Sequence, residues 1–252
     1  STKAGIDFYN AVLDFDKRED LKDPNGVWDL GTCEASEMAK LAETTYRDVN
    51  IALANQFAKF AETANIDIAK VIAASNSQPF SHIHQPGIAV GGHCIPIYPR
   101  FYLWNDPQAT VVRAAREANA GMPEHAVSLL NAELGSLSGK VVAVLGISYR
   151  GGVKESAFSG VFPTVTALKN SGAQVLVHDP MYTDEEIKNL GFEVYKIGGT
   201  VDGVILQADH AEYKKLTSKD FPGAKCVVDG RRALDKSNFA DVALRVIGAP
   251  AR

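Results

Sequence analysis

Apolar residues recur every three to four positions through the first half of the chain, which is the spacing of an amphipathic helix. The longest such pattern runs over Glu34–Thr63, and a shorter one follows over Asp67–Ser75. A third runs over Pro107–Leu134, where we expect Pro123 to kink the helix or to mark a boundary. Between them, Gln78–Pro99 is rich in proline, glycine and histidine and is predicted to be a loop.

The pattern changes after Gly135, where short continuous apolar runs alternate with helical segments. The runs that we expect to be strands are Lys140–Leu145, Gln174–His178, Phe192–Ile197, Gly203–Gln207, Ala224–Val228 and Leu244–Ile247. Helices are expected at Val161–Ser171 and Thr183–Leu190. Such strands are typical of a parallel sheet that carries helices on both faces. The predicted fold class is α/β, with an all-helical domain followed by a Rossmann-like domain.

The first 31 residues show neither a long helical pattern nor an alternation of strands and helices. We expect a helix at Ile6–Phe15, a turn at Asp23–Gly26 within a charged stretch, and a brief strand at Val27–Leu30. This segment is too small to bury a core of its own, so it should complete or contact another domain. The predicted division of the chain is therefore 1–31, 32–134 and 135–252.

Composition and charge exclude several classes of protein. The 252 residues carry 26 basic and 30 acidic side chains, a net charge of −4, which is not the basic surface that nucleic-acid binding needs. No apolar run approaches the roughly 20 residues that span a bilayer, and no signal peptide is visible. Three cysteines are too few, and odd in number, for a disulfide scaffold, which favours a reducing compartment, the cytoplasm.

The densest candidate for chemistry is the glycine-rich segment Pro86–Pro96, in which Gly91 and Gly92 precede His93 and Cys94. Because glycine has no Cβ, a ligand can approach this backbone closely. A neighbouring cation would lower the pKa of the thiol and raise its thiolate fraction. We expect a reactive thiol here, whereas the two other cysteines lack such surroundings and are interpreted as structural.

Three histidines near the thiol raise the question of zinc. His82, His84 and His93 lie in the same segment as Cys94, and these side chains can ligate zinc. Their spacing matches none of the usual zinc motifs, and no second anchoring element is present. We predict no metal site.

The first predicted strand of the Rossmann-like half is followed by Gly146 and then by Ile-Ser-Tyr-Arg-Gly-Gly. This is not the GxGxxG fingerprint, so this half is a poor candidate for binding NAD. The crevice at the strand ends could still hold another nucleotide. Four cations follow the predicted strands, where they could meet a phosphate group: Arg150, Lys154, Arg231 and Arg232.

Motifs of one known family occur in order along nearly the whole chain. They are Glu37–Leu41, Tyr46–Asn55, Gly91–Pro96, Arg116–Asn119 with Met122 and Pro123, Val144–Gly146, Lys154–Ser156, His178–Pro180 and Asp229–Arg232. Together they resemble the nucleotide-sugar dehydrogenases of the UDP-glucose/GDP-mannose dehydrogenase family.

The resemblance implies a four-electron oxidation, in which two NAD⁺ convert the C6 alcohol of a nucleotide sugar into a carboxylate for polysaccharide biosynthesis. It implies that Cys94 is the nucleophile, through a thiohemiacetal and a thioester, and that Lys40 steadies the oxyanion. Thr44 lies one helical turn after Lys40 and is also assigned to the catalytic site. Family members often have asparagine there, and many have aspartate at the position of Tyr98, so water and proton handling should differ.

The resemblance also implies a substrate site and an assembly. The residues expected to bind a UDP-sugar are Gly87, Val90, Gly91, Gly92, His93, Tyr149, Arg150, Lys154, Arg231 and Arg232. A homodimer through the central helical domain is expected. The NAD site should lie mostly in an N-terminal domain of which residues 1–31 are the tail, so this chain is expected to be truncated and inactive alone. The segment Arg47–Ile51 favours a UDP-N-acetylhexosamine, with UDP-glucose open.

Two other functions remain open from the sequence. A non-catalytic, dimeric nucleotide-binding or assembly module would fit the departures at Thr44 and Tyr98. A dehydrogenase of another hydroxy-substrate is the second alternative. The Gly-Gly-His-Cys segment argues against it, because simple alcohol oxidation needs no covalent step.

Overall fold

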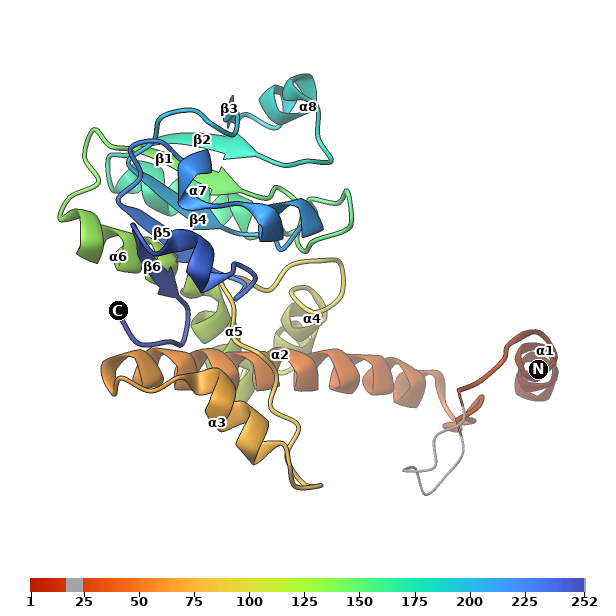
Figure 1. The fold of residues 1–252 in the computed structure, drawn as a ribbon. Helices are drawn as coiled ribbons and strands as arrows, with labels where there is room; N and C mark the ends of the chain where they lie inside the picture. The colour runs from red at the N-terminus through yellow and green to blue at the C-terminus, as the bar shows by residue number, and fades with distance from the viewer. Residues whose placement is uncertain (17–24, 252) are drawn as a thin grey trace. The chain divides into compact units, whose positions relative to one another are not determined.

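The structure is a computed structural model that describes residues 1–16 and 25–251 (Figure 1). Contacts divide the chain into two units, Ser1–Glu43 and Thr44–Arg252. In the first unit, helix α1 spans Thr2–Val12, so it begins and ends a few residues earlier than predicted. Of the expected turn at Asp23–Gly26, the first two residues lie outside the described residues, and Asn25 and Gly26 form a bend.

The strand predicted at Val27–Leu30 is wrong. These residues have no regular secondary structure, and the side chains of Trp28 and Leu30 are exposed. An extended segment becomes a strand only when a neighbouring strand accepts its hydrogen bonds, and the described residues of this unit contain none.

The long helical pattern corresponds to α2, which spans Cys33–Thr63 and so matches the prediction to within one residue. Helix α3 (Ile68–Ser75) begins after Asp67, whose carboxylate accepts a hydrogen bond from the N–H of Ala69 and caps the helix. The third pattern is split at Gly121 into α5 (Thr110–Ala120) and α6 (Met122–Leu134). Pro123 stands in the first turn of α6, so it marks the boundary that was expected.

Helix α4 (Tyr98–Asn105) was not predicted, because its first residues were assigned to the loop. The carbonyl oxygen of Cys94 accepts hydrogen bonds from the N–H groups of Ile97 and Tyr98, which closes the turn that leads into α4. Pro99 then occupies the first turn, where its missing N–H costs nothing. A turn that begins at Cys94 therefore joins the loop to α4.

The second half forms a six-stranded, all-parallel sheet, as predicted (Figure 1). Its strands are β1 (Val141–Leu145), β2 (Gln174–His178), β3 (Glu193–Val194), β4 (Gly203–Leu206), β5 (Cys226–Asp229) and β6 (Ala243–Val246). Their order is β3-β2-β1-β4-β5-β6, and Leu145 at the end of β1 is opposite both His178 and Leu206. The direction of winding reverses between β1 and β4, and open α/β sheets bind ligands at the carboxyl ends of strands beside such a reversal.

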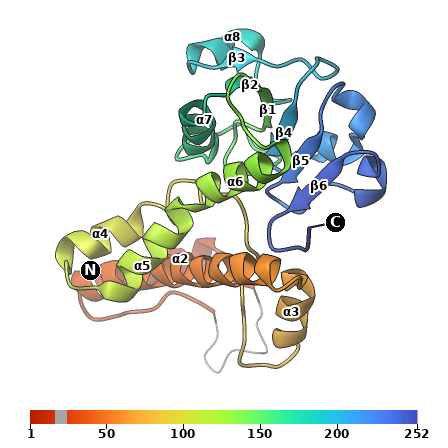
Figure 2. The same cartoon turned by 90° about the vertical axis from the view of Figure 1, so that its left-hand side faces the viewer.

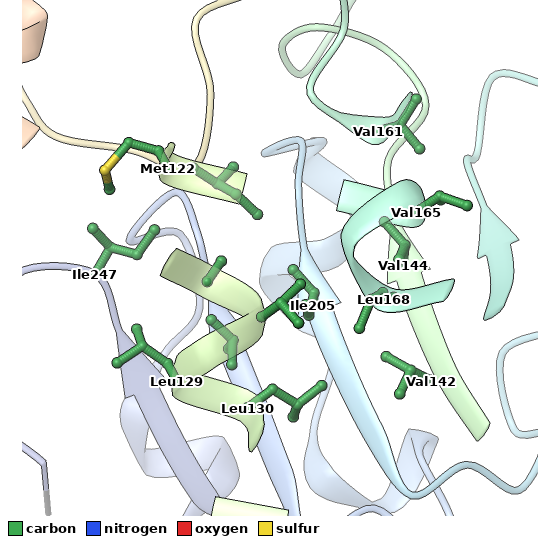
Figure 3. Packing of buried hydrophobic residues seen from close by; sticks show 14 of the residues in the cluster. Met122, Leu129, Leu130, Val142, Val144, Val161, Val165, Leu168, Ile205 and Ile247 are labelled. Carbon is green, nitrogen blue, oxygen red and sulfur yellow. The ribbon is translucent and has the colours of Figure 1, made fainter. Parts of the chain in front are cut away.

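One face of the sheet is covered by helices. Helix α6 packs on β4 and β5, while α7 (Val161–Asn170) packs on β1 and β2. Figure 2 shows α5 leading directly into α6, which reaches the sheet from the helical half. Figure 3 shows side chains of both helices meeting those of the strands, with Leu130 and Leu168 fully buried.

The other face lacks the α-helices that the pattern predicted. It is covered by three short 3₁₀ helices, η1 (Ala211–Lys215), η2 (Ser218–Asp220) and η3 (Lys236–Phe239), and by loops. The buried aromatic side chains on this face are Tyr195, Tyr213, Phe221 and Phe239. The short helix α8 (Asp184–Asn189) contacts β3 at the edge. None of the described helices combines the length and apolar character needed to cross a membrane.

Candidate functional site

A pocket of about 640 Å³ lies in the second unit, at the carboxyl ends of β1, β4 and β5. It is lined by Arg47, Ile51, Gln85, Pro86, Gly87, Ala89–Ile95, Tyr149, Arg150, Asp209 and Arg231. The sheet therefore supplies residues that directly follow three strands, and the helical half supplies the glycine-rich segment. We call Gln85–Pro96 the thiol loop.

Two glycines let the thiol loop approach the segment that follows β1. A Cβ on Gly91 would lie 2.6 Å from Cβ of Tyr149 and 2.9 Å from the carbonyl oxygen of Phe158, which no side chain could tolerate. Gly92 has a φ of 93°, in the left-handed region, and its N–H donates to the carbonyl oxygen of Ala157 at 3.1 Å. The Gly-Gly pair is thus required by the closeness of the two segments.

Cys94 is a free, half-buried cysteine in this pocket. The preceding His93 places Nε2 3.1 Å from Oε2 of Glu155, and both side chains face solvent. The pKa of Glu155 is lowered, first by the hydrogen bond from the N–H of Ala157 and then by His93. The site thus places a free thiol beside an exposed imidazole–carboxylate pair.

Arg231 supplies a fixed cation to the same pocket. Its Nε donates to the carbonyl oxygen of Gln207 at 2.7 Å, and one terminal nitrogen donates to the carbonyl oxygen of Tyr149 at 3.1 Å. Burial lowers the pKa of Arg231, while the carboxylates of Asp209 and Asp229 act against that shift. Guanidinium groups remain charged in proteins, so this half-buried cation suits a phosphate oxygen.

The other cations of the predicted phosphate cluster have different surroundings. Arg150 lines the pocket beside the ring of Tyr149. Arg232 does not line it, and its guanidinium lies 3.0 Å from a carboxylate oxygen of Asp67. Lys154 is also outside the lining, with Nζ 2.5 Å from Oε1 of Glu186. The structure therefore brings two of the four cations into the pocket.

The two proposed partners of Cys94 on α2 lie at the division between the units. Lys40 belongs to the first unit, is about half exposed, and places Nζ 3.0 Å from Oε2 of Glu43 one turn further along the helix. Thr44 begins the second unit, is fully buried, and is not among the residues that line the pocket.

Asp209 was missed by the sequence analysis. It lines the pocket, and its carboxylate accepts a hydrogen bond from the N–H of Gly151 at 2.9 Å. Burial raises its pKa, but this hydrogen bond and nearby cations outweigh that effect, and the net shift is downward. Its position just after β4, at the carboxyl edge of the sheet, was the available signal. In the described part of the chain, no group of three or more His, Cys, Asp or Glu side chains could share a metal ion.

Comparison with known proteins gives matches to both halves of the chain. Residues 34–121 match the central domain of the UDP-glucose/GDP-mannose dehydrogenase family, and residues 143–236 match the UDP binding domain of the same family. A UDP-N-acetyl-D-mannosamine dehydrogenase from Methanocaldococcus jannaschii is 36% identical over 210 residues, which are 83% of this chain and 48% of that relative. The chain spans about half the length of the curated relatives it matches.

Solved structures agree with these matches. The UDP-D-ManNAc dehydrogenase of Pyrococcus horikoshii superimposes with a TM-score of 0.72 at 32% identity, over 84% of this chain and 51% of that one. A UDP-N-acetyl-mannosamine dehydrogenase from Staphylococcus aureus superimposes with a TM-score of 0.72 at 34% identity, over 86% of this chain and 52% of that one. A UDP-glucose dehydrogenase from Pyrobaculum islandicum superimposes with a TM-score of 0.82 over 98% of this chain and 56% of that one. At 24% identity, this likeness supports the fold alone.

Proposed function

Because the chain belongs to the UDP-glucose/GDP-mannose dehydrogenase family, we propose that it binds a UDP-sugar in the pocket that contains Cys94. The proposed reaction is the NAD-dependent, four-electron oxidation of the C6 hydroxyl of that sugar to a carboxylate. The observation that carries this proposal is that Cys94 and Arg231 line one pocket at the reversal of the parallel sheet. A nucleophile and a diphosphate-binding cation are thereby within reach of one extended ligand.

We propose that Arg231 and Arg150 hold the diphosphate. Arg231 is already fixed by two carbonyl oxygens, so little side-chain freedom is lost when it meets a phosphate. The backbone of the thiol loop, including Gly87, Val90, Gly91 and Gly92, forms the opposite wall. This arrangement would direct the sugar toward Cys94.

The proposed role of Cys94 follows from the chemistry of an aldehyde that must be oxidised again. The thiolate adds to C6 of the aldehyde and forms a C–S bond, and the carbonyl oxygen becomes an oxyanion that we assign to Lys40. Loss of hydride from C6 leaves a thioester. Water then attacks the thioester carbon, which releases the carboxylate and returns the thiolate of Cys94.

NAD⁺ would supply the hydride acceptor for each oxidation. The described residues do not fit its usual binding motif. The segment after β1 lacks the GxGxxG sequence, and residues 146–160 separate β1 from α7, so no glycine turn leads directly into a helix. We therefore propose that the 252-residue chain alone does not reduce NAD⁺.

We propose a UDP-N-acetylhexosamine as the substrate. The segment Arg47–Ile51 favours this class, and relatives at 31–36% identity are named UDP-N-acetyl-D-mannosamine dehydrogenases. We also propose a homodimer, formed through exposed apolar side chains along α2. The cytoplasm is the proposed compartment, since the three cysteines are free thiols.

The test is a turnover assay of the chain joined to an NAD-binding domain of the family. With UDP-N-acetylmannosamine, we expect two NADH per sugar from the parent and from a Cys33→Ser control. Cys94→Ser should lose formation of the uronic acid, because no thioester can form. Equal rates in parent and Cys94→Ser would disprove the role of the thiol.

A further inference from the structure

Four polar side chains are buried between α2 and α5, behind the thiol loop and outside the pocket that contains Cys94. They are Asp48 and Asn55 of α2 and Arg116 and Asn119 of α5. Asp48, Asn55 and Asn119 are at most 3% exposed, and the side chain of Arg116 is 14% exposed. Burying such groups is costly unless they bond to one another, and the proposed reaction uses none of them.

The hydrogen bonds among these residues have a fixed direction. The carboxylate of Asp48 accepts two hydrogen bonds from Arg116, both 2.6 Å long, and a third from Nδ2 of Asn119 at 2.7 Å. A carboxylate only accepts, so the amide of Asn119 must turn its NH₂ group toward Asp48. Its Oδ1 then accepts from Nδ2 of Asn55 at 2.9 Å, which leaves Oδ1 of Asn55 facing the N–H of Gly87 at 2.9 Å.

The network reaches the thiol loop at both ends. Asn55 holds Gly87, and a terminal nitrogen of Arg116 lies 3.5 Å from the carbonyl oxygen of Pro96. Cys94 stands between these two anchors. We infer that Asp48, Asn55, Arg116 and Asn119 are positioning residues, which hold the thiol loop closed so that the sulfur of Cys94 keeps a fixed place in the pocket. Only the catalytic consequence of this inference rests on the proposed function.

The charge pair at the start of the network limits which variants can test it. Burial raises the pKa of Asp48, and the guanidinium of Arg116 acts against that shift. Removing either partner would leave an unpaired buried charge and could unfold the chain. Asn55 and Asn119 are the better positions, because Asn55→Ala and Asn119→Ala leave both charges in place.

Asn76 provides a matched control. Its side chain also makes two hydrogen bonds to the loop region, with Nδ2 donating to the carbonyl oxygen of Ile83 and Oδ1 accepting from its N–H, both at 2.9 Å. Ile83 precedes the thiol loop, and Asn76 takes no part in the network. Asn76→Ala therefore removes two side-chain hydrogen bonds at an exposed site without releasing either anchor.

The experiment measures the rate at which iodoacetamide alkylates Cys94 in the 252-residue chain. All variants carry Cys33→Ser, because Cys33 is exposed, and Cys226 is silent because burial raises its pKa to about 12. Cys94 is half-buried in the pocket, so the closed loop hinders alkylation and a loosened loop speeds it. We expect Asn55→Ala and Asn119→Ala to raise the rate about tenfold, and Asn76→Ala to leave it within about twofold, far below the melting temperature.

A double variant shows whether Asn119 acts on the thiol loop through Asn55 or independently of it. If Asn119 acts through Asn55, the Asn55→Ala/Asn119→Ala chain reacts no faster than the faster single variant. Multiplied effects, or an Asn55→Ala rate equal to that of Asn76→Ala, would overturn the inference. Slow exchange of the Gly87 amide hydrogen in the unsubstituted chain is also expected, and exchange as fast as in an open loop would contradict it. None of these measurements requires turnover, so failure of the proposed oxidation would not affect them.

Discussion

Arg231 and Arg232 are neighbours in the sequence but have different partners in the structure. The sequence predicts that cations follow the fifth strand, but it cannot tell which of them faces a ligand, because that depends on the turn. Arg232 has a φ of 53°, in the left-handed region, and its guanidinium contacts Asp67 of the helical half. Arg231 instead bonds to carbonyl oxygens that follow β1 and β4.

This difference predicts opposite effects of two adjacent substitutions. Arg231→Ala should weaken UDP binding about 10- to 100-fold, the range expected for a lost hydrogen bond to a charged group. Arg232→Ala should change the affinity less than about threefold, because its partner is Asp67. Isothermal titration calorimetry of the chain with UDP measures both. A larger loss in Arg232→Ala than in Arg231→Ala would reverse the assignment.

The ion pair of Lys154 with Glu186 makes a prediction about pH. The hydrogen bond from Lys154, with further hydrogen bonds from Thr183, lowers the pKa of Glu186 to about 2. A carboxyl whose pKa is depressed in the folded state stabilises that state above its ordinary pKa, and this contribution is lost as pH falls from about 4.5 to about 2. Lys154→Ala should raise the pKa of Glu186 toward 4.5, as followed by NMR titration, with Lys188→Ala as a control. An unchanged pKa would show that Lys154 does not hold this carboxylate.

At the scale of elements, the spacing of apolar residues predicted most helices and strands, because the need to bury one face of each element dictates that spacing. The strand Gln174–His178 was predicted with its observed bounds. Its alternate residues Val175 and Val177 are buried in the core, and this spacing is visible in the sequence. The prediction failed where tertiary context decides. Val27–Leu30 has no neighbouring strand, and α4 begins because the backbone of Cys94 closes a turn, which no apolar spacing reveals.

The contact between α6 and the sheet should be a main source of stability. Leu130 is fully buried, and a Cβ on Gly203 of β4 would lie 2.8 Å from one of its methyl groups. Leu130→Ala should lower the free energy of unfolding by about 2–5 kcal/mol, the range for core leucines. Val111→Ala, at an exposed site on α5, should change it by less than about 0.5 kcal/mol. Urea denaturation checks both, and equal effects would argue against the packing described.

At the scale of the whole molecule, α2 carries a row of large side chains with no cover among the described residues. Tyr46, Leu53, Phe57 and Phe60 recur at intervals of three, four and seven along the helix, and all are exposed. Such a row is typical of a helix that pairs with a second copy.

The candidate site was only partly predictable from the sequence. The thiol loop and the carboxyl ends of the strands are far apart in the chain, and the sequence does not show that they meet.

The row predicts the oligomeric state. The chain should sediment as a dimer, and Phe60→Glu should shift it to a monomer, because a buried charge would face an apolar surface. Glu117→Lys on α5, outside the row, is the control for a change of charge alone and should remain dimeric. Sedimentation velocity at micromolar concentration distinguishes these states, and a monomeric parent chain would contradict the proposed assembly.

The central claim is that the pocket beside Cys94 binds a uridine nucleotide sugar, and a thermal-shift titration tests it most directly. A ligand that binds only the folded state stabilises it by about 2.7 kcal/mol at a hundredfold excess over its dissociation constant. We predict a higher melting temperature with UDP and UDP-N-acetylhexosamines, no change with GDP-mannose, and a smaller shift in Arg231→Ala. No shift with any uridine ligand, or an equal shift in Arg231→Ala, would contradict the account.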